Sequence, residues 1–199
     1  MTAQIGDQFI IKEKEYTLVA ISDPIGFDPR MYGIVPKPIC SACWRGYWCI
    51  YEMFEKGLFL KDLYISSENN NYPPINGVSP CSKSKDSAAA VTELFHPKYK
   101  NINMPIDFTG KILVGNDFIN DYYIHMGYQR SWGYKNLKEL IFDNGILTDT
   151  IDHSDLALQM REEISRNLDK SDNDLYEYIP HAVNECFSEA LRCKAWWIK

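Results

Sequence analysis

Two short segments combine aromatic residues with one basic or titratable side chain each. Arg45 lies within Trp44-Arg-Gly-Tyr47, and His125 lies within the tyrosine-rich segment Tyr122–Tyr128. Aromatic walls with a few polar groups suit sugars and planar ligands. An arginine can clamp a carboxylate, and a histidine can act as a general base. These features predict a small-molecule site with six candidate ligand-binding residues: Trp44, Arg45, Tyr47, Tyr123, His125 and Tyr128.

Arg45 and His125 also have structural interpretations, which the sequence favours. Arg45 can stack on a neighbouring ring or form a salt bridge inside the fold. If the segment around His125 is a strand, alternation places Tyr123 and His125 on one face and Ile124 on the other. His125 then needs only a hydrogen-bonding neighbour in a half-buried sheet, and no ligand.

Cys40 and Cys43 are spaced as a Cys-x-x-Cys motif. In a redox protein this motif opens a helix after a strand, whereas here a strand-like segment follows it. A structural zinc site needs two more ligands, and the remaining cysteines and histidines do not repeat the paired spacing. The six cysteines are therefore interpreted as free thiols, and neither a metal nor a cofactor is predicted.

The common catalytic motifs are absent from the sequence, which has no Gly-x-Ser-x-Gly, P-loop, His-Glu-x-x-His or Gly-x-Gly-x-x-Gly. A carboxylate pair for glycoside hydrolysis could come from Glu52, Asp62, Asp107 or Asp121, but their spacing selects no pair. Catalytic groups also assemble from distant positions, so an enzyme stays open. The sequence favours a role without catalysis.

The charge is negative and unevenly distributed. The formal net charge is −6, and no basic run typical of nucleic-acid binding is present. Of the 27 acidic and 21 basic residues, ten acidic and six basic lie from Ile151 onward, a net charge of −4. This segment favours a basic protein partner. An acidic intracellular protein of this size fits an inhibitor or immunity-type role, and binding to nucleic acid is not expected.

The sequence does not predict export or a membrane anchor. Met1–Asp7 lacks the basic and apolar regions of a signal peptide, and no apolar run has the length of a transmembrane span. The chain is therefore expected in the cytoplasm.

Strand signals dominate the first 150 residues. Runs of β-branched and aromatic residues are separated by short turns, of which Asn144-Gly145 is the strongest hairpin signal. The predicted strands are Gln8–Lys12, Glu15–Ile21, Trp44–Phe54, Leu58–Ile65, Phe108–Val114, Asn120–Tyr128, Leu137–Phe142 and Ile146–Thr150.

The pattern changes after Asp152. Leu156, Met160 and Ile164 recur every four residues on a helix expected from Ser154, and Pro180 suits the start of another. Residues 66–104 form a long polar loop with one short helix expected at 86–95. The fold class is α+β: mainly an antiparallel sheet or sandwich over about residues 1–150, with two or three C-terminal helices over 151–199 packed on it, all in one domain.

Three segments together resemble a family of small uncharacterised bacterial proteins. They are Ser41–Tyr47 with the hairpin that follows, Tyr72–Val78, and Pro105–Leu113 leading to the His-Met-Gly of residues 125–127. The resemblance covers roughly residues 5–150. It implies a bacterial, cytoplasmic protein and transfers no catalytic residue.

Overall fold

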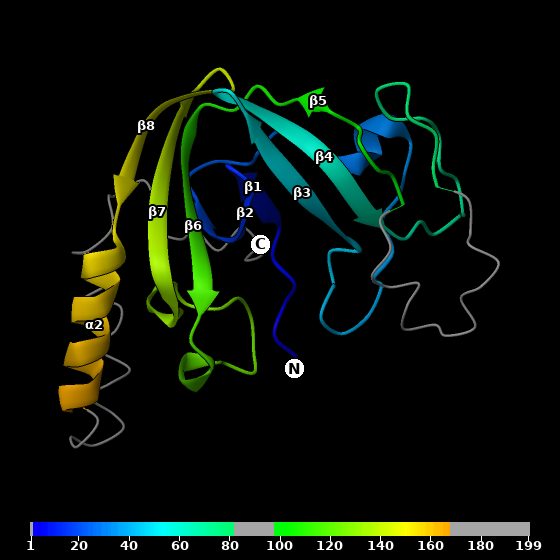
Figure 1. Ribbon diagram of the computed structural model, residues 1–199. Helices are drawn as coiled ribbons and strands as arrows, with labels where there is room; N and C mark the ends of the chain where they lie inside the picture. The colour runs from blue at the N-terminus through cyan, green and yellow to red at the C-terminus, as the bar shows by residue number, and fades with distance from the viewer. Residues whose placement is uncertain (1, 82–97, 168–199) are drawn as a thin grey trace.

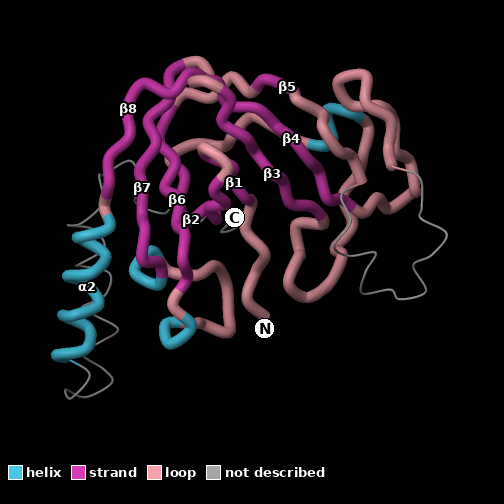
Figure 2. Tube along the Cα trace, in the orientation of Figure 1, coloured by secondary structure: helices cyan, strands magenta, loops and turns pink. Residues whose placement is uncertain are grey.

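The computed structural model describes residues 2–81 and 98–167 (Figures 1 and 2). Within these ranges a sheet dominates, accompanied by one α-helix and three short 3-10 helices. The strands are β1 (Gln8–Ile11), β2 (Lys14–Ile21), β3 (Tyr47–Phe54), β4 (Gly57–Ile65), β5 (Met104–Pro105), β6 (Gly110–Phe118), β7 (Tyr134–Asp143) and β8 (Ile146–Asp152). The helices are α2 (Ser154–Asn167), η1 (Pro29–Tyr32), η2 (Asn120–Tyr122) and η3 (Ser131–Gly133).

Tight turns build the predicted hairpins. Lys12 and Glu13 join β1 to β2 with φ of 48° and 66°, and Asn144 and Gly145 join β7 to β8 with φ of 47° and 76°. Positive φ at both turn residues matches the twist of the flanking strands. A Cβ on Gly145 would lie 2.3 Å from the carbonyl oxygen of Ile106, so this position has room only for glycine.

The sheet is mixed rather than purely antiparallel. β1 pairs antiparallel with β2, but it pairs parallel with β3 over four residues, from Gln8↔Ile50 to Ile11↔Met53. The prediction of an antiparallel sheet therefore holds for the other strand pairs and is wrong for this one. The long connection between β2 and β3 allows the chain to return to the starting end of the sheet, so that β3 runs in the direction of β1.

The strands close into a ring. In spatial order they run β3-β1-β2-β6-β7-β8-β4, and β4 pairs again with β3. The weakest link is between β8 and β4, which pair at Gly57↔Ile146 alone. Two backbone bonds support this link, from Leu58 N to Gly145 O at 2.9 Å and from Leu147 N to Lys56 O at 2.7 Å.

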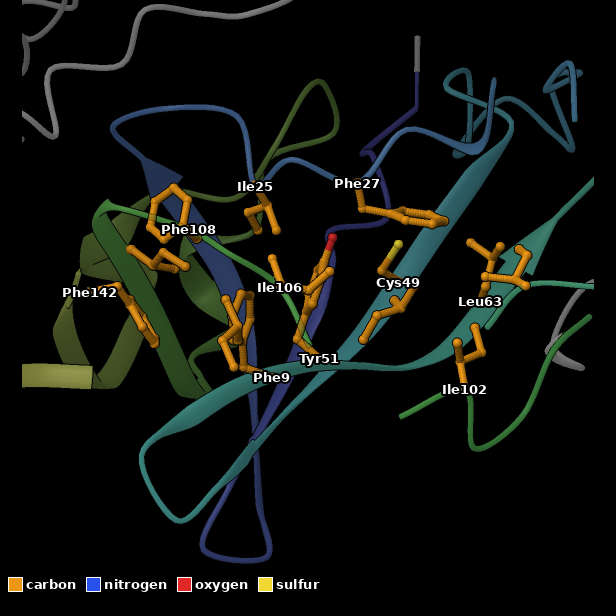
Figure 3. Packing of buried hydrophobic residues seen from close by; sticks show 14 of the residues in the cluster. Phe9, Ile25, Phe27, Cys49, Tyr51, Leu63, Ile102, Ile106, Phe108 and Phe142 are labelled. Atoms are coloured by element: carbon orange, nitrogen blue, oxygen red, sulfur yellow. The ribbon is translucent and has the colours of Figure 1, made fainter. Parts of the chain in front are cut away.

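The main core fills the inside of this ring. Phe9, Ile112 and Leu60 come from different strands and are fully buried there. Figure 3 shows Phe108 and Phe142 at one end of the cluster and Leu63 at the other. Burying an aliphatic or aromatic side chain of this kind contributes about 1.5–3 kcal/mol, so the cluster is the main source of stability.

A second, smaller core lies on the outer face of the sheet. There Ala157, Met160 and Ile164 of α2 pack against Leu113 and Leu137. The predicted helix from Ser154 is confirmed, and its apolar stripe covers the sheet as expected. The other helices predicted, at 86–95 and after residue 170, lie outside the described residues. None of the helices in the described ranges has the length and apolar character needed to cross a lipid bilayer.

Within the polar segment 66–104, several of the described residues are anchored to the rest of the fold. Ile75 and Tyr99 are fully buried, and the Tyr99 hydroxyl donates to the carbonyl oxygen of Pro73 at 2.7 Å. Ser67 is also buried, and its hydroxyl donates to Asn69 at 2.7 Å. These parts of the loop belong to the fold despite their polar composition.

Candidate functional site

The N-terminal segment joins the two aromatic segments that the sequence singled out. Ala3 forms a parallel bridge with Gly127, and the Gln4 amide donates to the Gly127 carbonyl at 2.8 Å. The amide of Ile5 donates to the carbonyl of Ala42, also at 2.8 Å. The loop before β3 and the loop after η2 therefore lie on either side of residues 3–5, although about 80 residues separate them in sequence.

A buried ion pair lies beneath this junction. The Asp7 side chain is 4% exposed and accepts two hydrogen bonds from the Arg45 guanidinium, one of them at 3.2 Å from Nη1 to Oδ2. The Cys49 amide donates to Asp7 Oδ1 at 2.7 Å. Arg45 Nε donates to the Tyr47 carbonyl at 3.0 Å, and its Cζ lies 4.3 Å from the centroid of the Tyr47 ring.

Arg45 thus makes both of the structural contacts considered for it, the salt bridge and the ring contact. Burial is the largest single influence on the Arg45 pKa and lowers it, but the charge and the hydrogen bonds of Asp7, with smaller contributions from Cys49 and Tyr47, together raise this pKa above its usual range. The guanidinium is therefore held charged by a partner within the fold. An incoming carboxylate would have to compete with Asp7 for it.

The groups around the ion pair remain protonated near neutral pH. Burial raises the pKa of Tyr47 and of Tyr128, although the nearby Arg45 charge lowers both. Burial likewise raises the pKa of the Cys43 thiol to about 11. Because the thiolate is the reactive form of cysteine, Cys43 is a poor nucleophile in this position.

The other three candidate residues lie at the surface. Trp44 is 67% exposed, and its backbone amide donates to the Gln4 side chain at 3.3 Å. Tyr123 and His125 are also exposed, and their rings meet edge to face with centroids 5.1 Å apart. The Trp44 side chain and the Tyr123–His125 pair are therefore the candidate groups that a ligand could reach.

The strand predicted over Asn120–Tyr128 is wrong. Residues 120–122 form η2, and the chain then turns as a loop in which Gly127 has φ of +76°. The Gln129 side chain replaces a strand partner, since it accepts from the Ile124 amide at 3.0 Å and donates to the Ile124 carbonyl at 2.9 Å. Strand alternation therefore does not decide where Tyr123 and His125 point.

The structure divides the six candidate residues into two groups. Arg45, Tyr47 and Tyr128 lie inside, around Asp7, whereas Trp44, Tyr123 and His125 lie outside. A small-molecule site formed by all six stays a prediction. Within residues 2–81 and 98–167, no cluster of three or more His, Cys, Asp or Glu side chains is arranged to hold a metal ion.

Asp7 and Glu139 are both buried charged residues that the sequence did not single out. Glu139 of β7 is 1% exposed, and its two carboxylate oxygens contact Lys111 Nζ and His153 Nε2, each at 3.0 Å. The cluster connects β6, β7 and the residue that precedes α2. The sequence gives one signal for this cluster. Glu139 lies two residues after Leu137 and therefore on the same face of β7, the face on which Leu137 packs under the helix. The cluster fixes the start of α2 on the sheet.

Exposed carboxylates gather on the opposite side of α2 and on β8. This surface, the acidic face, comprises Asp149 and Ile151 on one side of β8, Asp152 on the other side of that strand, and Asp155, Leu158 and Glu162 on α2, all of them exposed. Asp155, Leu158 and Glu162 follow the helical spacing of three and four, so they share one side of α2. The buried Ala157, Met160 and Ile164 occupy the other side.

Of the two basic residues of α2, one neutralises a single carboxylate of the acidic face and the other is directed away from it. Arg161 turns inward, and its Nη1 donates to the carbonyls of Trp132 at 3.0 Å and Tyr134 at 2.8 Å. Arg166 pairs with Glu162 at 3.3 Å. Hydrogen bonds from the hydroxyl and the amide of Ser154 lower the pKa of Asp152, so that carboxylate is ionised at neutral pH.

The comparisons with known proteins give no relative from which a function could be transferred. No protein-family model, no curated protein and no solved structure matches the chain. The resemblance to a family of small bacterial proteins therefore stays a prediction, and the proposals below depend on the geometry alone.

Proposed function

We propose that this chain binds a basic protein partner through its acidic face, in the manner of an inhibitor or an immunity-type protein. The observation that supports the proposal is the set of exposed carboxylates on β8 and α2, whose neighbouring arginine at position 161 is engaged with backbone carbonyls. Opposite charges on two surfaces speed encounter and reject partners of the wrong sign.

Apolar anchors supply the second part of a protein interface. Leu158 is 48% exposed between Asp155 and Glu162 on α2, and Ile151 is 39% exposed on the adjoining strand. Interfaces combine an apolar centre that loses water with a polar rim that sets specificity. The acidic face combines these two exposed aliphatic side chains with four exposed carboxylates.

The surface is also held in place by the fold. The amide of Ser154 donates to the Asp152 carboxylate at 2.9 Å, which caps the start of α2. Beneath it, the Glu139 cluster and the buried stripe of α2 fix the helix to β7. A surface that is already ordered loses little conformational entropy on binding, which favours affinity.

The experiment compares the native chain with a charge-neutral variant that keeps side-chain shape: Asp149→Asn, Asp152→Asn, Asp155→Asn and Glu162→Gln together. Both are immobilised and used to capture proteins from cells that express the chain naturally, at about 50 mM and about 300 mM salt. We expect a basic protein on the native chain at the lower salt, a reduced amount at the higher salt, and none on the variant.

A control variant carries the same kind of change at exposed positions outside the acidic face, Glu13→Gln, Glu15→Gln and Glu68→Gln. It should capture the partner as the native chain does. Because asparagine caps helices about as well as aspartate, the Asp152→Asn change should leave α2 folded, which circular dichroism checks. Capture that survives neutralisation of the acidic face, or that does not respond to salt, would contradict the proposal.

A further inference from the structure

Strand β8 has a complete neighbour on one side only. β7 pairs with it from Lys138↔Asp152 to Asp143↔Ile146. On the other side β8 meets β4 at one residue pair, and from Thr148 onward no strand of the described residues pairs with it. Figure 1 shows β8 as the outermost strand beside β7, leading directly into α2. Every side chain from Thr148 to Asp152 is exposed.

The register shows which backbone groups face outward. The His153 amide donates to the Leu137 carbonyl at 2.8 Å, which fixes the phase of the β7–β8 ladder. Since hydrogen-bonded and non-hydrogen-bonded pairs alternate, Ile151 bonds with β7 while Thr150 and Asp152 direct their backbone groups away from it. In agreement, the Thr150 amide donates to the Asp149 side chain at 2.8 Å rather than to β7.

We propose that this open edge of β8 accepts an extended basic segment of the partner protein as an additional strand. The inference rests on the proposed function and specifies how the partner is held. An exposed sheet edge offers main-chain hydrogen bonds to any extended peptide, and side chains at alternate positions then select the partner. The open stretch from Thr148 to Asp152 is about 17 Å long at about 3.3 Å per residue, which is the length of an ordinary short strand.

The charges on the edge favour a basic segment over a second copy of this chain. Asp149 is the second residue of the open stretch and Asp152 the last, and Asp155 follows in the first turn of α2. A second copy would bring the same carboxylates to the same short ladder, where like charges destabilise pairing. Lys138 pairs with Asp152 across the ladder, and its charge is among the influences that lower the Asp152 pKa, so Asp149 and Asp155 are the carboxylates that Lys138 leaves for an incoming basic segment.

Asp149 makes strand addition dependent on charge. Its carboxylate holds the Thr150 amide, which a new strand would need as a donor. A lysine or arginine of the incoming segment offers this carboxylate a partner of opposite charge, so its bond to the Thr150 amide can be exchanged for an ion pair. The Thr150 amide is then released into the new ladder. An uncharged strand has no such replacement, so the edge resists indiscriminate pairing.

Amide hydrogen exchange on the full isotope-labelled chain tests the edge directly. In the free chain, the Thr150 and Asp152 amides should exchange faster than those of Ile151 and His153, which bond to β7 or point toward it. The probe is an acetylated peptide that alternates lysine and valine over about seven residues, an extended length that covers the open stretch. Adding it should slow exchange at Thr150 and Asp152 at least about tenfold.

Two controls separate strand addition from attraction by charge. The same peptide with N-methyl groups at alternate residues keeps its charge but cannot form a ladder. The variant Thr150→Pro keeps all the carboxylates, and since its amide is not used by β7, proline is tolerated there as on other edge strands. Relative to Thr150→Ala, it should weaken binding of the unmodified peptide at least about tenfold, or about 1.4 kcal/mol.

The outcomes distinguish the two proposals. Protection by the unmodified peptide alone, lost in Thr150→Pro, supports strand addition. Equal binding of both peptides without protection overturns strand addition and leaves the acidic face as a charge-guided surface. An Asp152 amide already protected in the free chain, or binding of neither peptide, also overturns strand addition, and the capture experiment above then decides the proposed function separately.

Discussion

The ion pair between Asp7 and Arg45 offers the sharpest test of how the N-terminal junction is held. Asp7 accepts three hydrogen bonds, two from the guanidinium and one from the Cys49 amide. Asp7→Asn keeps an acceptor for Cys49 but removes the charge that compensates Arg45. Leaving one member of a buried pair alone costs about 3–5 kcal/mol, and since the Arg45 side chain is 21% exposed, we expect the lower end, about 3 kcal/mol.

Equilibrium unfolding in urea, followed by tryptophan fluorescence, measures this loss. With a slope of about 2 kcal/mol per M, a loss of about 3 kcal/mol moves the midpoint by about 1.5 M at constant slope. Arg45→Met should cost a similar amount because it leaves the Asp7 carboxylate unpaired. The double variant Asp7→Asn with Arg45→Met should lose clearly less than the sum of the two, since neither charge then remains buried alone.

The exposed pair of Arg166 and Glu162 provides the matched control. Arg166→Met removes a surface ion pair one helical turn long, which contributes about 0.3–0.5 kcal/mol. If Asp7→Asn moves the midpoint no more than this control, or if the two single losses simply add in the double variant, the ion pair does not anchor the junction and the reasoning is refuted.

Two further predictions concern the same region. Gly46→Ala should lower the free energy of unfolding by more than about 2 kcal/mol in urea melts, because Gly46 has φ of +79° and a Cβ there would lie 2.5 Å from the Lys37 carbonyl oxygen. Gly77→Ala, at φ of +77° with no atom within 4 Å, should cost only about 1 kcal/mol; equal losses would contradict the steric explanation. Burial raises the pKa of Cys43 from 9.0 to about 11, so its contribution to stability is complete below about pH 9 and declines as the pH rises through 11. In urea melts from pH 8 to 11, the free energy of unfolding should decline less steeply with pH for Cys43→Ala than for the native chain. Parallel declines would show that ionisation of Cys43 does not contribute.

Local features of the fold could be predicted from the sequence because they depend on neighbouring residues. Asn144-Gly145 supplies two positive φ angles, and the fourfold spacing after Ser154 produces the buried stripe of α2. By contrast, the parallel pairing of β1 with β3 joins residues about 40 positions apart. Nothing in the intervening sequence determines on which side of β1 the third strand will lie.

The candidate site was predicted less completely, for two physical reasons. The tyrosine-rich segment before Gly127 has the composition of a strand, but its backbone groups bond to nearby residues, Ile124 to the Gln129 side chain and Tyr123 to the Asn120 carbonyl, which composition does not reveal. The role of Arg45 depends on Asp7, which lies far from it in sequence. The role of Glu139 likewise depends on its partners Lys111 and His153. Charge pairing across a fold leaves no local pattern in the sequence.

The single contact that closes the ring sets an order of events during synthesis. Gly57 can pair with Ile146 only after Ile146 has been synthesised, and these residues are 89 positions apart. At about 5–20 residues per second, the ribosome takes roughly 4–18 s to make that interval. β5 and the residues next to it, which bond to β4 from Leu58 to Leu63, are made well before Ile146 and cover most of this edge. Only the Gly57 end of the hairpin therefore stays without its partner until β8 emerges, and this short stretch is the part of β4 exposed to wrong pairing in the nascent chain.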